Sequence, residues 1–199
     1  MTNPYASFDI LAILTFIRQQ LGNASETELH LLSYLSCLLS LYRKKPVSAW
    51  GYEFFCSKMG IPFSSDLSNS LLQLTHYAAV KSEGEYYTIT DSGTESFVEL
   101  QKLEQNKERL PFLEAACSSI LSLPIGVVRD ALINEPSFSN KKLTGGTRQL
   151  FDDAGLENLY SQFSALSDSL GFHVGDLMVP AVVWLSYLSR IANLEMDKT

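Results

Sequence analysis

The sequence predicts a mainly α-helical protein with one small β-hairpin. Apolar residues recur at helical spacing through most of the 199 residues, and 46% of the chain is hydrophobic, which is enough to build a core. The hairpin is predicted by residues 86–89, an aromatic and β-branched run that follows a glycine-containing turn. Residues 78–81 are expected to form its first strand, with Gly84 free to adopt a positive φ in the turn.

The first half of the chain reads as a series of helices around this hairpin. A helix is expected over residues 8–21, and Ser25 with Glu28 has the spacing of a capping box that starts a second helix. Pro46 ends that helix. Further helices are predicted over residues 48–59 and 64–76, before the hairpin, and over 91–105, after it.

The second half is expected to be a separate helical domain. Residues 101–109 are polar except for Leu103, and Pro111 restarts the apolar pattern, so we place a boundary between a domain of residues 1–106 and one of residues 107–199. Helices are predicted over residues 111–121, 125–133, 152–170 and 176–194. Residues 135–146, rich in Ser, Asn, Lys and Gly, are expected to form a polar loop.

Charge and cysteine content indicate a cytoplasmic protein with no general affinity for polyanions. The formal net charge of −7 opposes nonspecific attraction to nucleic acid or anionic lipid. Cys37, Cys56 and Cys117 are odd in number and widely spaced, as expected of small buried residues in a reducing compartment. The start of the chain lacks a secretory pattern, and Pro180 and Arg190 interrupt its longest apolar region, which argues against a membrane span.

The catalytic motifs that we can test for are absent, so we expect no enzymatic activity and no cofactor or metal. The three histidines stand alone, and the chain has neither a Gly-x-Ser-x-Gly elbow nor a phosphate-binding Gly-x-x-x-x-Gly-Lys-Ser/Thr loop. The basic group around Lys141, Lys142 and Arg148, next to Gly145 and Gly146, could hold a phosphate through cations and exposed amides. Its composition is more typical of a solvated loop.

Nucleic-acid contact is weakly supported. The helix over residues 64–76 contains no Lys or Arg, and only Asn69, Gln73 and His76 are suited to reading bases. Lys81 in the hairpin is opposed by two glutamates. The triplet Arg43, Lys44 and Lys45 is more typical of a helix C-terminus than of a phosphate site.

Aromatic residues are the other candidate contacts. Trp50, Tyr52, Phe54 and Phe55 are expected on one helix, too close together to face a single core. Trp184 and Tyr187 form a second cluster on the last helix. We therefore predict a protein interface that includes Trp50, Tyr52, Phe55, Trp184 and Tyr187, although ordinary core packing is the alternative for each of them.

Residues 25–105 resemble a winged helix-turn-helix domain, with an extra N-terminal helix before it. The resemblance rests on the helix order and on the strand-to-helix sequence Tyr87-Thr88-Ile89-Thr90-Asp91-Ser92-Gly93. With its acidic charge and helical second half, the chain also resembles small accessory subunits of bacterial ATPase complexes. These are the kleisin-interacting (KITE) subunits of SMC machines and the middle components of three-component, Lamassu-type antiphage defence systems.

The resemblance implies a non-enzymatic adaptor that binds an SMC-like or ABC-type ATPase in a DNA-sensing or antiphage complex. An effector protein is a possible further partner, a homodimer is possible, and DNA contact is expected to be weak or confined to the complex. The alternative is a winged-helix transcriptional regulator. That reading requires DNA contact by Asn69, Gln73, His76 and Lys81, helped by the basic triplet, and a dimer formed by the C-terminal helices.

Overall fold

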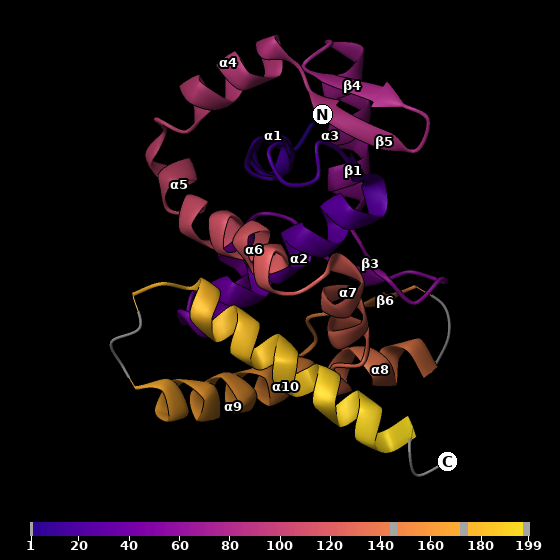
Figure 1. Ribbon diagram of the computed structural model, residues 1–199, viewed down its shortest axis with the longest axis vertical. Coiled ribbons are helices and arrows are strands. Elements are labelled where there is room, and N and C mark those ends of the chain that lie inside the picture. The colour runs from indigo at the N-terminus through magenta and orange to yellow at the C-terminus, as the bar shows by residue number, and fades with distance from the viewer. Residues whose placement is uncertain (1, 144–146, 172–174, 197–199) are drawn as a thin grey trace.

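The protein is mainly helical, with two small antiparallel sheets (Figure 1). The computed structural model describes residues 2–143, 147–171 and 175–196. Among these residues, no single helix has both the length and the apolar character to cross a membrane. The helical stretches Glu104–Ser122 and Ile125–Ile133 together have the length and composition of a membrane span, but the chain bends by 114° at their junction.

Two long helices form the centre of the first half. Helix α1 (Pro4–Ile17) begins four residues earlier than predicted, because the Asn3 side chain accepts hydrogen bonds from two backbone amides and Pro4 suits the first helical position. Helix α2 (Glu26–Tyr42) begins at the predicted capping box of Ser25 and Glu28. Every residue from 29 to 41 is buried, so α2 is surrounded by protein on all sides.

The prediction of a helix over residues 48–59 is wrong. This segment contains a short 3₁₀ turn, η1 (Val47–Trp50), and then strands β2 (Phe55–Cys56) and β3 (Pro62–Phe63). Gly51 has a φ of 87°, which ends the turn in a conformation that other residues rarely adopt. Beyond it, Tyr52 and Phe54 are buried while Glu53 is exposed, the alternation of an extended chain rather than the periodicity of a helix.

The predicted hairpin is present next to helix α3 (Ser65–His76), but its first strand begins at Val80, two residues later than expected, and Ala78 has a φ of 57°. Strands β4 (Val80–Glu83) and β5 (Tyr86–Ile89) pair in antiparallel register, and strand β1 (Ala24–Ser25) adds to the other edge of β5. Thr90 then caps helix α4 (Asp91–Leu100) by accepting a hydrogen bond from Gly93. This helix ends earlier than predicted and is followed by the single turn α5 (Glu104–Lys107).

The second half consists of helices α6 (Leu110–Ser122), α7 (Ile125–Ile133), α8 (Pro136–Leu143), α9 (Asp153–Leu170) and α10 (Met178–Met196). The polar loop predicted over residues 135–146 is wrong where it overlaps α8. The Glu135 carboxylate accepts a hydrogen bond from the Phe138 amide, which caps the start of α8, and the Phe138 side chain is buried. Strand β6 (Arg148–Gln149) follows and pairs with β2.

One continuous hydrophobic core runs through both halves of the chain. Helix α6 packs against α1 and α2, while β6 completes the sheet begun by β3 and β2. Cys37, Cys56 and Cys117 are buried in this core, as predicted, and burial raises the pKa of each thiol. The boundary between residues 106 and 107 stays a prediction, and the helix that follows it packs directly on the first half.

Candidate functional site

Helix α3 is held against α2 by a buried histidine. His30 Nδ1 accepts a hydrogen bond from the Ser64 amide at 3.1 Å, and its Nε2 lies 3.2 Å from Ser68 Oγ. Ser68 donates to the Glu26 carboxylate, which also lies 3.5 Å from His30. The hydrogen bond with His30 is the main reason that the pKa of Glu26 is below its usual value. These contacts fix the start of α3, whose inward face buries Leu67 and Leu71.

The opposite side of α3 is open and has an unusual composition. We call the exposed residues Asn69, Leu72, Gln73, His76 and Tyr77 the α3 outer face. Leu72 is 68% exposed and Tyr77 is 73% exposed, whereas α3 itself contains no Lys or Arg. A helix that binds DNA in the major groove needs cations near the phosphates. The α3 outer face offers two large apolar side chains instead.

The hairpin beside α3 also lacks a free positive charge. Lys81 Nζ lies 2.5 Å from a Glu83 carboxylate oxygen, and the hydrogen bond from Lys81 lowers the pKa of Glu83. Glu85 is exposed at the turn. Lys81, predicted as a nucleic-acid contact, is therefore neutralised by its neighbour, and the turn as a whole would repel a phosphate backbone.

The basic triplet lies at the far end of α2 from α3. Helix α2 has 17 residues, so its two ends are about 25 Å apart. Lys45 Nζ is 2.7 Å from a Glu108 carboxylate oxygen, and Arg43 donates to the Gly175 carbonyl at 3.2 Å. The structure thus does not bring Arg43, Lys44 and Lys45 into one surface with Asn69 and Gln73.

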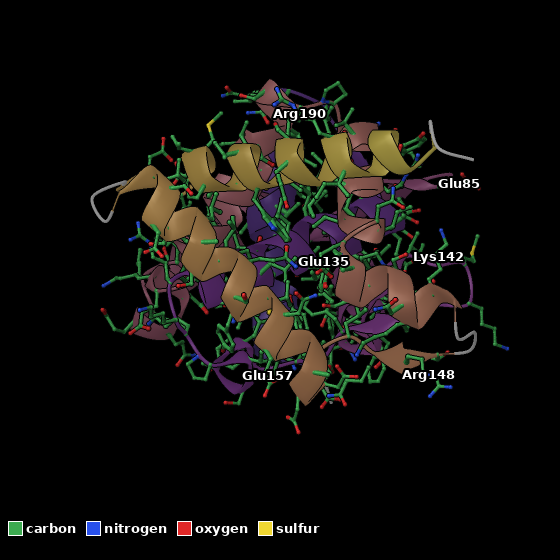
Figure 2. The ribbon with its side chains drawn as sticks, turned by 90° about the horizontal axis from the view of Figure 1, so that it is seen from below. Glu85, Glu135, Lys142, Arg148, Glu157 and Arg190 are labelled. Carbon is green, nitrogen blue, oxygen red and sulfur yellow. The ribbon has the colours of Figure 1, made fainter. Side chains whose placement is uncertain are left out.

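A second group of basic residues surrounds the start of α9. Lys142 and Arg148 lie on one edge of the molecule in Figure 2, and a cavity of about 510 Å³ is lined in part by Lys141 and Arg148. The Asp152 carboxylate already occupies the anion position at this helix N-terminus. It accepts a hydrogen bond from the Gly155 amide and lies 2.7 Å from Lys141 Nζ, which lowers its pKa. The neighbouring Gly145 and Gly146 lie outside the described residues.

Three of the predicted interface aromatics are buried in the protein itself. Trp50, Tyr52 and Trp184 are 2%, 6% and 3% exposed, so the prediction that they present surface to a partner is wrong. The error for Trp50 and Tyr52 arises from the helix predicted over residues 48–59, which is absent. Phe55 is partly buried in β2, and only Tyr187 is well exposed, at 56%.

Trp50 and Tyr52 instead enclose a buried ion pair that connects the two halves. Arg109, in front of α6, donates to Asp9 of α1 through Nε at 2.9 Å and Nη2 at 2.5 Å, and its Nη1 donates to the Trp50 carbonyl. The guanidinium lies 3.8 Å from the centre of the Trp50 ring, and Tyr52 donates its hydroxyl to Asp9. Burial raises the pKa of Asp9, and Arg109 opposes this shift only in part.

Helices α9 and α10 converge at one end of another face and spread apart toward the other (Figure 2), and both line a groove of about 460 Å³. Trp184 forms part of its lining and donates its indole N–H to Gln162, which in turn donates to the buried Glu135 carboxylate. Tyr187 and Val183 stand at the exposed edge of α10. Of the residues predicted to form an interface, Trp184 and Tyr187 are therefore brought together, far along the chain from Phe55.

Leu72 and Tyr77 were not predicted as functional residues. The signal available for Leu72 was its position off the apolar stripe of Leu67, Leu71 and Leu74, since a leucine outside the stripe of an amphipathic helix is exposed. Tyr77 follows the last residue of α3, and its exposure depends on the turn into β4, which helical periodicity does not describe.

Within the described parts of the chain, no three His, Cys, Asp or Glu side chains gather in a way that could hold a metal ion. In the described residues, the buried pair of Asp9 and Arg109 is satisfied by its own hydrogen-bond partners. Two surfaces that expose large apolar side chains among polar ones are the α3 outer face and the α9–α10 groove. Comparison with protein-family models, with curated proteins and with solved structures finds no match to this chain.

Proposed function

We propose that this protein is a winged-helix adaptor, without catalytic activity, that binds a larger SMC-like or ABC-type ATPase in a bacterial DNA-sensing or antiphage complex. The observation that carries the proposal is the α3 outer face, which exposes Leu72 and Tyr77 where a DNA-reading helix would carry cations. Large apolar and aromatic side chains of this kind are typical of the centre of protein interfaces.

The order of elements supports a winged helix. Helix α1, strand β1, helices α2 and α3, and the hairpin β4–β5 follow one another, and the sheet order is β1-β5-β4. In this assignment α1 is the first helix of the domain rather than an extra one, and α3 is the helix that would read DNA. Residues 43–63 are an insertion between α2 and α3, and its strand β2 pairs both with β3 and with β6 of the second half.

Charge supports an adaptor over a transcriptional regulator. Residues 1–106 contain 7 Lys and Arg against 11 Asp and Glu. Two of these cations, Lys45 and Lys81, form ion pairs with carboxylates. A regulator that contacts several phosphates needs the opposite balance. The proposed DNA engagement therefore belongs to the ATPase, with this protein bound to it.

Co-purification with a matched control tests the proposal. Tagged protein expressed from its native gene cluster should recover an ATPase that mass spectrometry identifies by its nucleotide-binding motifs. Leu72→Glu and Tyr77→Ala should each reduce recovery by about tenfold or more, since truncating an interface anchor costs about 2 kcal/mol or more. Met59→Glu, at an 83% exposed position in the β2–β3 turn, should leave recovery unchanged.

Thermal unfolding of each variant must match the wild type before recovery is compared. Recovery of the protein with no ATPase, or equal recovery by all three variants, would contradict the proposed function. Titration of the protein with duplex DNA distinguishes an adaptor from a transcriptional regulator. Nanomolar, sequence-specific binding that is lost in the Asn69→Ala/Gln73→Ala variant would favour a regulator over an adaptor.

A further inference from the structure

The α9–α10 face carries a row of small side chains on α9 and a row of larger side chains on α10. On α9, Ser161, Ala165 and Ser169 are exposed at intervals of four residues and form a row of small side chains. On α10, Val179, Val183 and Tyr187 repeat at the same interval and are 42%, 40% and 56% exposed. One surface therefore carries both a row of projecting side chains and a row that can receive them.

We propose that this face binds a second copy of the same chain. A two-fold axis along the line that bisects α9 and α10 would lay α10 of each copy antiparallel on α9 of the other. Val179 would then meet Ser169, Val183 would meet Ala165, and Tyr187 would meet Ser161, twice in the dimer. The four helices would pack as a bundle of two antiparallel pairs.

The charges on and around the groove fit a second copy of the chain. Among the described residues, none that lines the groove is charged, although the chain has a net charge of −7, so two copies can approach here without direct repulsion. At the rim, the same antiparallel arrangement brings Arg190, just beyond Tyr187, to Glu157, one turn before Ser161. Both are exposed, and Figure 2 shows them at opposite edges of one molecule, too far apart to pair within it.

The groove can also be covered at little cost in hydrogen bonds. The Trp184 indole N–H is satisfied by Gln162, and the Gln162 amide by Glu135. Ser169 donates its hydroxyl to the Ala165 carbonyl of its own helix. Because these polar groups already have partners, removing water from them leaves few donors unpaired.

Light scattering and sedimentation of the purified full chain over about 1–100 µM test the proposal. The wild type should be a dimer, and Ala165→Glu and Val183→Glu should each raise the dissociation constant by about tenfold or more. Leu121→Glu, at a 60% exposed apolar position on α6, is the control and should leave it unchanged. A monomer throughout this range, or a dimer that persists in both groove variants, would overturn the proposal.

Charge reversal and cross-linking give independent readouts if a groove variant unfolds. Glu157→Arg and Arg190→Glu should each weaken the dimer by about two- to tenfold, and the chain with both changes should recover it. A mixture of Ala165→Cys and Val183→Cys chains should form a mixed disulfide on oxidation, since the native cysteines are buried. Failure of both the charge rescue and the mixed disulfide would refute the arrangement, whatever the ATPase co-purification shows.

Discussion

Replacing Arg109 by Met should destabilise the protein by about 3–5 kcal/mol, because it leaves the Asp9 carboxylate buried without its counter-charge. Asp9 is 0% exposed and Arg109 is 4% exposed. The change removes two hydrogen bonds to Asp9, one to the Trp50 carbonyl, and the stacking of the guanidinium on the Trp50 ring. Only the Tyr52 hydroxyl would still donate to the carboxylate.

Urea unfolding measures this loss directly. With a slope of about 2 kcal/mol/M, the unfolding midpoint should fall by about 1.5–2.5 M. The Asp9→Leu/Arg109→Met chain is the informative companion, since it removes both charges and should recover most of the stability. A loss below about 1 kcal/mol in Arg109→Met, or a double variant as unstable as the single one, would refute the reasoning.

The pH dependence of the Arg109→Met variant has a definite sign. Burial raises the pKa of Asp9, and the variant lacks the Arg109 charge that opposes this shift. An acid whose pKa is higher in the folded state binds a proton more readily there than in the unfolded chain. The folded state therefore gains stability as pH falls through the raised pKa toward the unfolded value of about 3.9. The difference in unfolding free energy between wild type and variant should therefore narrow as pH falls from 7 through the raised pKa of Asp9.

Three further changes test other parts of the fold. Gly93→Ala should cost about 2 kcal/mol or more in urea unfolding, because its Cβ would lie 2.0 Å from the Ala79 carbonyl oxygen; Gly126→Ala, where a Cβ meets no atom within 4 Å, should not. Asp152→Asn keeps a capping oxygen but loses the ion pair with Lys141, and should cost at most about 1 kcal/mol at pH 7 because Asp152 is largely exposed. Since the pKa of Asp152 is lowered, this contribution is present above pH 4 and is lost as pH falls through the folded pKa, so the two proteins should converge in acid. Replacing His30 by Phe removes the acceptor for the Ser64 amide, and hydrogen exchange at the start of α3 should become faster while exchange in α9 stays unchanged.

Local signals predicted the helices well, and the failures have a common physical origin. The stripes and caps of Glu26–Tyr42, Ser65–His76 and Ile125–Ile133 define helices within the sequence itself, and the structure confirms them. The prediction for residues 48–59 failed because buried aromatic residues alternate there with the exposed Gly51 and Glu53, a pattern that depends on α1, α6 and β6. The polarity of residues 135–146 likewise concealed Phe138, which anchors α8 in the core.

The candidate site was predicted only by exclusion. The absence of cations on α3 is readable from the sequence, and it argued against DNA reading. The exposure of Leu72 and Tyr77 is a property of the packed helix, because it depends on which side of α3 faces α1 and α2. For the same reason, Trp50 and Trp184 could not be told from surface aromatics until the chain segments that cover them were placed.

The contacts between the two halves have a consequence for the order of folding. Asp9 meets Arg109, and Phe55 pairs with Gln149, so these contacts close loops of about one hundred residues. Helix α2 is buried on every side, yet α6, which covers much of it, is synthesised about 70 residues later. A nascent chain that has just completed the hairpin therefore leaves exposed the apolar side chains of α2 that α6 later buries. We therefore expect the core to form only after α6 has been synthesised. Because its contacts join residues far apart in the sequence, the folding rate should be low for a helical protein.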